Sequence, residues 1–313
     1  MNFALTISNN DTGGTIEVTS SSGCNDWRIP SDGLDGFGNM PLDTAQEVLA
    51  AGDGGVLLGG HIGLRQLVLK LEAPATEDKR DEAARVLAVG TSVTLKVTYN
   101  RSSARTISGT VTGCKLNEGN IYEPTAVTAT IDCQDPAFRG EDVTKTAYSY
   151  TSGTGITGFS WRMDLEGDSL ATLKEFSMAY TTKNTEAVTL SSQSTVTLSI
   201  NRLSYKPFSL PKQTVYAWNA GPAKGETVAA KTSVEWKVKL DGQLPYCLYG
   251  DTSYGMESAI LGDWKGLGAH NVLPTSNTGY MVSLRVTMDS SVTPLTIAFA
   301  DGKMVYTPGW QGI

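Results

Sequence analysis

Few side chains in this 313-residue chain have the types and spacing that catalysis needs. The only two histidines, His61 and His270, each lie in a glycine-rich stretch with no Cys, His or acidic residue at metal-ligand spacing. We expect both to be surface or loop histidines, with a role as ligand or base as the alternative. The sequence also contains no Gly-x-Ser-x-Gly elbow, the pattern that marks a serine nucleophile.

Carboxylate chemistry is less well defined by the sequence. Asp32, Asp35 and Asn39 could offer oxygen ligands to calcium, but the full loop spacing and the terminal glutamate of a calcium loop are missing, so turn formation is favoured. A pair of acids for glycoside hydrolysis stays open, because the two carboxylates need proximity in space and not in sequence. We therefore predict no catalytic residue, no metal site and no cofactor, and an enzyme is only the third hypothesis.

One glycine pattern resembles a nucleotide site. Gly153-Thr-Gly-Ile-Thr-Gly158 has the glycine spacing of a dinucleotide-binding loop, which works only when a strand enters and a helix leaves towards the pyrophosphate. Here the following residues alternate as a strand. We interpret residues 140–158, which are rich in Thr, Ser, Tyr and Gly, as a connection between two domains.

Five aromatic residues of the C-terminal half could instead line a sugar-binding platform, or they could pack in a core or an interface, which is favoured. The sugar-contact candidates are Trp218, Tyr254 and Trp264, and Tyr246 and Tyr249 complete the group.

Composition limits the class of protein. The formal charge of −7 and the pI near 5.0 argue against a nucleic-acid groove, because backbone binding needs a basic surface. The length favours two domains, and 33 glycines in a chain with 40% apolar residues predict mostly β structure. We expect no secretory signal at the start, and no segment approaches the roughly 18 apolar residues of a membrane span.

Four cysteines are too sparse for a disulfide framework or a zinc ribbon. If residues 107–114 and 126–133 form a hairpin, Cys114 faces roughly Val127 and Cys133 faces roughly Ser108. The two thiols are then beyond disulfide reach. We predict reduced, buried cysteines and folding in a cytosol.

The N-terminal half reads as an α+β module. Strands are predicted at residues 3–7 and 15–19, and residues 23–63 are rich in loops with one short helix from Asp43 to Ala51, where Thr44 and Glu47 have capping-box spacing. A buried strand follows, with Leu67, Leu69 and Leu71 on one face, and then a helix with Thr76 as N-cap, Gly90 as stop and an apolar face of Ala83, Val86 and Leu87. Alternation at Val93, Leu95 and Val97 predicts the next strand.

The C-terminal half reads as an all-β domain. Strand alternation begins at Phe159, Trp161 and Met163, and further strands are predicted near residues 196–200, 234–240, 282–288 and 295–299. Asp241-Gly242 and Asp301-Gly302 are predicted to form tight hairpins, the second with Phe299 opposite Met304. The fold class expected is therefore mainly β, an N-terminal domain with one helix followed by a β-sandwich.

The N-terminal half resembles the distal tail protein family of long, non-contractile-tailed bacteriophages. The resemblance covers roughly residues 20–138 and depends on the order of loose patterns more than on any single one. These are Trp27-Arg-Ile-Pro-Ser-Asp-Gly33, Gly52-Asp-Gly-Gly55, Arg65-Gln-Leu-Val-Leu69, the helix, Thr110-Val-Thr-Gly-Cys114 and Asp132-Cys-Gln-Asp-Pro136. The C-terminal half matches less well, and its ending Tyr306-Thr-Pro-Gly-Trp310 is compatible with the family.

The resemblance implies a structural hub at the virion tail tip, assembled in the host cytoplasm. Residues 1–145 would form the ring domain, a suspected homo-hexamer with Trp27, Phe37 and Arg65 at its interfaces, and residues 146–313 would form a β-sandwich, galectin-like in some relatives. The implied partners are the tail tube protein, the tape measure protein and tail-tip or fibre proteins, with no membrane and no specific nucleic-acid binding, although DNA passes through such rings. The alternative is a carbohydrate-binding protein that contacts the host surface through its C-terminal domain.

Overall fold

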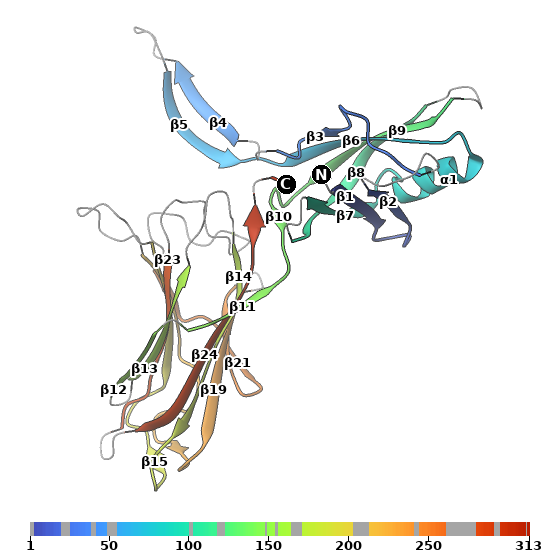
Figure 1. Ribbon diagram of the computed structural model, residues 1–313. Helices are drawn as coiled ribbons and strands as arrows, with labels where there is room; N and C mark the ends of the chain where they lie inside the picture. Colours follow the sequence, from blue (N-terminus) through green and yellow to red (C-terminus); the bar gives the residue numbers. More distant parts are fainter. Residues whose placement is uncertain are drawn as a thin grey trace. The chain divides into compact units, whose positions relative to one another are not determined.

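The computed structural model describes most of the chain as antiparallel β structure with one α-helix, as the sequence predicts (Figure 1). Contacts divide it into two compact units, unit 1 with residues 1–141 and 309–313 and unit 2 with residues 142–308. The structure describes residues 1–313 except 1–2, 20–25, 39–41, 49–54, 100–102, 118–122, 148, 154–155, 164–170, 203–212, 241–243, 261–279, 291–294 and 311.

The main sheet of unit 1 is antiparallel throughout its described strands. Its order is β2-β1-β7-β8-β9-β6-β3, and β1 and β2 form the predicted hairpin with Leu5 opposite Val18. The strands are β1 (Phe3–Asn9), β2 (Thr15–Thr19), β3 (Leu34–Asp35), β6 (Arg65–Ala73), β7 (Ser92–Tyr99), β8 (Arg105–Leu116) and β9 (Thr125–Cys133).

The predicted alternation on β6 and β7 is confirmed. Side chains two residues apart lie on the same face of a strand, so one face of each strand enters the core. The buried set on these two strands is Leu67, Leu69, Leu71, Val93, Leu95 and Val97.

The helix α1 (Glu77–Val86) begins at the predicted N-cap. The hydroxyl of Thr76 accepts a hydrogen bond from the backbone N–H of Lys79 at 3.3 Å, and Glu77 and Asp78 place negative charge at the positive end of the helix. Ala83, Val86 and Leu87 are fully buried, as predicted.

Removing the cap tests this local account. Thr76→Ala is expected to destabilise α1 by about 1 kcal/mol, because a helix-terminal N–H loses its acceptor. Deuterium exchange at the amides of α1 should then be roughly fivefold faster, whereas Thr76→Ser, which keeps the hydroxyl, should change it little. Unchanged exchange in Thr76→Ala would contradict the assigned cap.

Asn9, at the end of β1, joins α1 to the sheet. Its side-chain amide donates to the carbonyl of Val86 at 2.9 Å and to the hydroxyl of Thr91 at 2.9 Å. Its side-chain oxygen accepts from the N–H groups of Asp11 and Thr12, both at 2.9 Å. One buried side chain therefore satisfies a C-terminal carbonyl of the helix and the β1–β2 turn together.

The sheet curls around α1. The helix contacts β1 and β2 on one side and β9 on the other. In the order of the sheet, β2 and β9 are four strands apart, which in a flat sheet would separate them by about 19 Å, more than the roughly 10 Å diameter of a helix. Contact with both strands requires curvature, which encloses the apolar core of unit 1.

The predicted helix over residues 43–51 is wrong. This region forms a two-stranded hairpin of β4 (Leu42–Val48) and β5 (Gly55–Ile62), with Leu42 opposite Ile62 (Figure 1). Capping-box spacing at Thr44 and Glu47 marks a helix start only when a helical apolar face follows, and none does. Of the Gly52-Asp-Gly-Gly55 cluster, Gly55 begins β5, and residues 52–54 lie outside the described residues.

The β8–β9 hairpin has a different register from the predicted one. Cys114 lies opposite Ala129, not Val127, because the hairpin is centred one residue later than predicted. A bulge between Val111 and Gly113 shifts only the pairs farther from the turn, such as Thr110 with Asp132. The described cysteines Cys114, Cys133 and Cys247 are all free; Cys133 and Cys247 are buried as predicted, whereas Cys114 is only partly buried.

Unit 2 is a β-sandwich of two six-stranded antiparallel sheets around one core. One sheet has the order β11-β24-β14-β19-β20-β21, with β11 (Val143–Thr146), β14 (Thr172–Thr182), β19 (Ser233–Lys239), β20 (Tyr246–Tyr249), β21 (Thr252–Tyr254) and β24 (Ile297–Thr307). The other has the order β12-β13-β23-β16-β17-β22, with β12 (Ser149–Gly153), β13 (Ile156–Met163), β16 (Thr195–Arg202), β17 (Gln213–Trp218), β22 (Ser258–Ile260) and β23 (Tyr280–Thr287). The short strands β15 (Val188–Thr189) and β18 (Thr227–Val228) pair separately.

Two turn predictions in unit 2 differ from the structure. Asp301-Gly302 lies inside the continuous strand β24, where Gly302 pairs with Met178 and Asp301 with Ala179 of β14. The long partner strand β14 accounts for this, because it spans both halves of β24. Asp241-Gly242 lies outside the described residues, although β19 and β20 on either side do pair antiparallel.

The connection predicted at residues 140–158 is more ordered than expected. It contains β11, β12 and the start of β13, and the glycine pattern lies in the β12–β13 hairpin with Gly153 opposite Ile156. A strand enters and a strand leaves. Unit 1 ends at Glu141, near the predicted boundary at residue 145, but it also includes residues 309–313, because β25 (Gly309–Trp310) pairs with β10 (Phe138–Arg139).

Candidate functional site

The residues flagged for metal chemistry do not form a site among the described residues. No group of three or more His, Cys, Asp or Glu side chains is placed to hold a metal ion in the part of the chain that the structure describes. Asp32 pairs with Lys70, and Asp35 accepts a hydrogen bond from the N–H of Gly36 at 2.8 Å. His61 lies in β5, while Asn39 and His270 fall outside the described residues.

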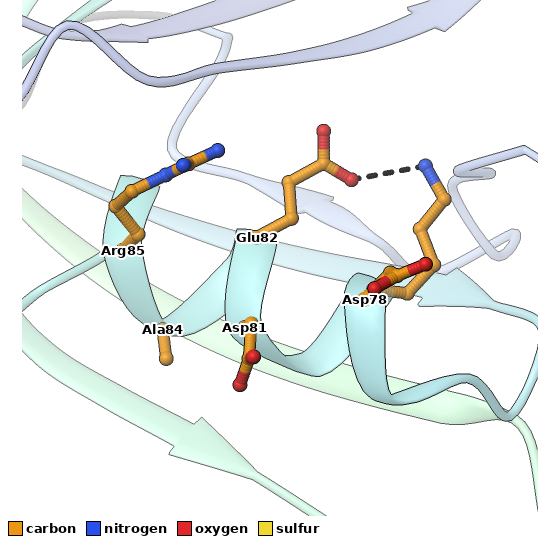
Figure 2. A pocket seen from close by; sticks show the side chains of 6 residues that line it. Asp78, Asp81, Glu82, Ala84 and Arg85 are labelled. Carbon is orange, nitrogen blue, oxygen red and sulfur yellow. Dashed lines mark hydrogen bonds and ion pairs between the residues drawn. The ribbon is translucent and has the colours of Figure 1, made fainter.

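A depression that is open to solvent follows α1 (Figure 2). A second depression adjoins it, lined in part by Glu17 of β2 and by Trp27. Glu82 lines both, and its carboxylate accepts hydrogen bonds from the indole N–H of Trp27 and from the Lys79 ammonium, each at 2.9 Å. These contacts anchor the helix to the loop before β3, which is a structural role. The six residues around the larger depression are Asp78, Lys79, Asp81, Glu82, Ala84 and Arg85.

A buried aromatic and cationic cluster lies where the β4–β5 hairpin joins the main sheet of unit 1. Arg65 is 1% exposed, its guanidinium carbon lies 5.1 Å from the ring centroid of Phe138, and its Nη2 donates to the carbonyl of Gly38 at 3.2 Å. The rings of Phe37 and Phe138 are 6.0 Å apart. Two of the three residues predicted at an interface, Phe37 and Arg65, therefore meet around Phe138.

The third predicted interface residue, Trp27, lies elsewhere in the core of unit 1 and is 1% exposed. Because the side chains of Trp27, Phe37 and Arg65 are all buried within one unit, their contacts are with the same chain. Their assignment to an interface between copies stays a prediction.

Arg105, the first residue of β8, completes this region. Its guanidinium carbon lies 4.6 Å from the ring centroid of Trp310, and its Nη1 donates to the carbonyl of Gly312 at 2.5 Å. Burial lowers the pKa of both Arg65 and Arg105. Both still carry charge at neutral pH, because an arginine side chain is not deprotonated in proteins. The region is thus held by two partly desolvated cations over aromatic rings, a contact that strengthens when water is excluded.

Cys133 lies opposite Arg65 across the β6–β9 ladder. Burial raises the pKa of its thiol to about 12, and the nearby guanidinium opposes that shift only in part. The thiol therefore stays protonated at neutral pH and is not an activated nucleophile.

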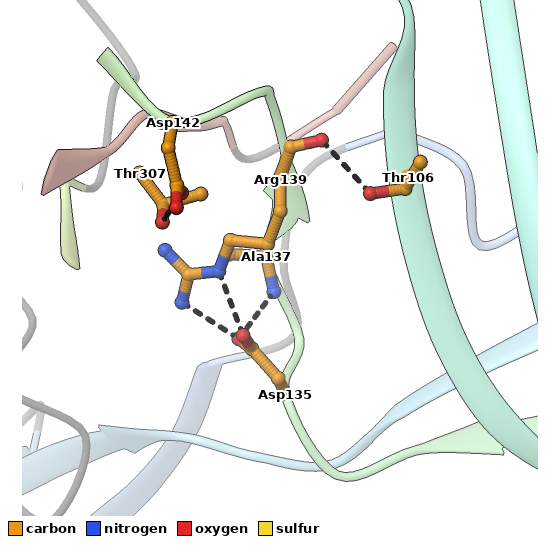
Figure 3. Close-up of polar contacts among 6 residues, drawn as sticks. All are labelled: Thr106, Asp135, Ala137, Arg139, Asp142 and Thr307. Carbon is orange, nitrogen blue, oxygen red and sulfur yellow. Dashed lines mark hydrogen bonds and ion pairs between the residues drawn. The ribbon is translucent and has the colours of Figure 1, made fainter. Parts of the chain in front are cut away.

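Asp135 fixes the segment that leads into β10, through hydrogen bonds with Ala137 and Arg139 (Figure 3). The guanidinium of Arg139 donates from Nε to Asp135 Oδ2 at 2.7 Å and from Nη2 to Oδ1 at 3.0 Å, while the N–H of Ala137 donates to Oδ1 at 3.1 Å. The hydroxyl of Thr106 donates to the carbonyl of Arg139 at 3.1 Å. A two-bond arginine–carboxylate contact fixes direction as well as distance, so it sets the path of the chain through β10.

Asp142, the first residue of unit 2, gives a test in acid. Its carboxylate accepts from Lys174 Nζ at 2.8 Å and from the Thr307 hydroxyl at 2.6 Å, and these two hydrogen bonds lower its pKa. A lowered pKa gives stability that is present above the unfolded pKa of about 3.9 and is lost as the pH falls through the folded pKa. Since Asp142 is half exposed, we expect these contacts to contribute less than about 1 kcal/mol to the free energy of unfolding.

The wild-type protein should therefore melt at a higher temperature than Asp142→Asn near neutral pH, and this difference should shrink in acid, as calorimetry would show. Lys174→Gln should reproduce part of the effect, because it removes the cation that donates to the carboxylate. A difference between wild type and Asp142→Asn that is constant with pH would contradict the assigned role of these contacts.

The predicted sugar-contact residues are not grouped on a described surface. Trp218 is fully buried, with its indole N–H donating to the carbonyl of Pro245 at 3.4 Å. Tyr254 is half-buried against the same core, and Trp264 lies outside the described residues. Trp218 is thus a core residue of unit 2, as the favoured interpretation expects, and sugar binding by Tyr254 or Trp264 stays a prediction.

Phe138, Arg105 and Trp310 were missed as members of a site. Arg105 precedes a predicted strand and Trp310 is near the end of the sequence, so no local spacing connects them. A detectable signal would have been two arginines, Arg65 and Arg105, at the starts of strands that are otherwise apolar on one face, because such positions rarely bury a charge without a partner.

No described helix is long and apolar enough to cross a membrane. No family model and no curated protein matches the chain. Among solved structures, the crystal structure of SPP1 Dit (gp 19.1), described as a paradigm of the hub adsorption apparatus in phages that infect Gram-positive bacteria, covers 98% of this chain and 99% of its own at 15% identity and a TM-score of 0.48.

A phage P2 baseplate structure covers 97% of each chain at 10% identity with a TM-score of 0.32. A structure of the Gx strain of infectious bursal disease virus covers 99% of this chain and 68% of its own, at 8% identity with a TM-score of 0.25.

Proposed function

We propose that this chain is a structural virion protein, a distal tail hub whose unit 1 assembles into a closed ring between the tail tube and the tail tip or baseplate. The observation that carries the proposal is the β4–β5 hairpin. Within the described residues its two strands pair only with each other, over seven residue pairs from Leu42–Ile62 to Val48–Gly55.

A hairpin of this kind favours a partner outside the chain. An isolated two-stranded hairpin is marginally stable in water, and each of its outer edges carries unpaired N–H and C=O groups. Its sequence is also apolar on β5, with Val56, Leu57, Leu58 and Ile62. A second copy of the chain would supply hydrogen-bond partners for these edges and apolar surface against which the residues of β5 can pack.

A ring is the arrangement that such a contact produces when it closes. If the hairpin of one copy pairs with a different surface on the next, the interface is heterologous, and a heterologous interface closes into a ring or extends into a filament. We propose six copies, following the resemblance to distal tail proteins. The order of elements behind that resemblance, from Trp27 through β6 and α1 to the β8–β9 hairpin, is present within unit 1.

The remaining features fit the same proposal. A chain with a formal charge of −7 does not hold DNA that passes through a channel. Free cysteines are compatible with folding in the host cytoplasm before incorporation into the virion. We assign to unit 2 the role of an accessory β-sandwich, galectin-like in type. The proposed partners of the chain are the tail tube protein, the tape measure protein and the tip or fibre proteins.

Labelling of virions tests this proposal. In particles of the phage that encodes the chain, gold-conjugated antibody against unit 2 should bind at the tail end, at the junction between tube and tip structures. A parallel label against the tail tube protein marks the tube as the positional control. Absence of the chain from purified virions, shown by mass spectrometry, would refute the assignment.

A further inference from the structure

The last residues of the chain return to unit 1 beside the segment that leaves it. Phe138 pairs with Trp310 and Arg139 with Gly309, so β10 and β25 lie next to each other as antiparallel strands (Figure 1). Unit 2 is therefore inserted into unit 1 along the chain, with the outgoing and returning segments hydrogen-bonded together.

Beyond β25 the chain contacts the residues that lead into the β4–β5 hairpin. The N–H of Ile313 donates to the carbonyl of Phe37 at 3.3 Å. Gly312 is so close to Gly38 that a Cβ on Gly312 would lie 2.8 Å from the Gly38 carbonyl oxygen. Arg105 holds the same segment from the other side, through its hydrogen bond to Gly312 and its position over the ring of Trp310.

The residues that follow β5, at the second end of the hairpin, lie near the same residues. Arg65 begins the strand that follows β5, and its guanidinium donates to the carbonyl of Gly38 while lying over the ring of Phe138. Phe37 packs near that ring as well. Phe37 and Arg65, one at each end of the β4–β5 hairpin, thus both contact Phe138. Phe138 in turn pairs with Trp310 at the end of the chain.

We propose that the described residues at the end of the chain, 309–310 and 312–313, act as a clasp on the base of the β4–β5 hairpin. While the clasp is seated, Phe37 and Gly38 are fixed and the hairpin has a defined root. When the clasp leaves, Phe37 and Gly38 lose their contacts with it, and the hairpin opens more often. Since the clasp directly follows β24, the last strand of unit 2, an event that pulls on this strand reaches the root of the hairpin, and by reciprocity a hairpin held in an assembly stabilises the clasp.

Deuterium exchange on the full chain tests this coupling, at a dilution at which light scattering gives the mass of one copy. Deleting residues 309–313 should accelerate exchange of the amides in residues 42–62 by at least about tenfold, with β7 and β9 changed less than about twofold. Gly312→Ala should produce a smaller acceleration of the same amides, because its methyl group pushes the clasp away from Gly38.

Gly38→Ala is the matched control, since a Cβ on Gly38 meets no atom within 4 Å. Its methyl group points away from Gly312, so it should leave exchange of residues 42–62 and of the clasp unchanged. The proposal is overturned if the deletion leaves exchange of residues 42–62 as in the wild type. It is equally overturned if β7 and β9 accelerate as much as the hairpin, because that is a general loss of stability and not a clasp. The measurement is made on single copies, so its failure would leave the ring proposal standing.

Discussion

Replacing residues 42–62 with a short Gly/Ser linker is expected to leave the chain folded but monomeric. The hairpin pairs with no third strand in the described residues, so its removal breaks no ladder of the main sheet, while its edges are the groups that a neighbouring copy would pair with. We expect the concentration needed for assembly to rise by at least about 100-fold. Light scattering coupled to gel filtration would measure this.

The design keeps Phe37, Gly38, Leu64 and Arg65, so that the root of the hairpin is intact. A matched control replaces Gly250-Asp251, the turn between β20 and β21 of unit 2, with Asn-Gly and should assemble like the wild type. If the linker variant has native circular dichroism and still forms the wild-type oligomer, the hairpin is not the assembly element.

Trp236→Ala is expected to have the largest effect on stability. Trp236 is fully buried, and its ring lies 5.4 Å from that of Tyr180 and 5.1 Å from that of Tyr249. Its indole N–H donates to the carbonyl of Ala220 at 3.2 Å. Loss of a buried tryptophan costs about 3–5 kcal/mol, which lowers the melting temperature of a unit of this size by about 10 °C. Calorimetry of the full chain would detect the shift.

The expected result is a selective loss in unit 2. Because the two units have separate cores, exchange at the amides of α1 in unit 1 should not change. Trp236→Phe keeps an aromatic ring but leaves the Ala220 carbonyl without its donor, so a smaller shift is expected. A single unfolding transition, with exchange in α1 accelerated as much as in unit 2, would show that the units do not unfold separately.

Local sequence patterns predicted those elements for which the spacing of apolar residues and the signals at the ends indicate the same structure. The β6 strand, α1 with its Thr76 cap, and β7 follow from alternation, from helical spacing and from a Ser/Thr-type cap. Residues 42–48 form a strand in place of the expected helix, because the glycine-rich sequence 52–55 favours a turn and no helical apolar face follows the capping pattern. The turn expected at Asp301-Gly302 failed because an adjacent long strand, β14, continued the ladder through it.

The site could be predicted only in part. Phe37 and Arg65 were selected through a family resemblance, and the structure brings them together around Phe138. Trp310 joins them from more than 170 residues away in the sequence, through a two-residue strand pair that no period can reveal. Arg105 was not predicted for the same reason, since its partners Trp310 and Gly312 are set by the return of the chain.

Native mass spectrometry of the unmodified full chain tests the central claim most directly. The ring proposal predicts one discrete assembly of six 33.3-kDa chains, about 200 kDa, with closed cyclic symmetry in electron-microscope class averages. A chain that stays at 33.3 kDa at every concentration, or that forms only open filaments without a ring, would contradict the account.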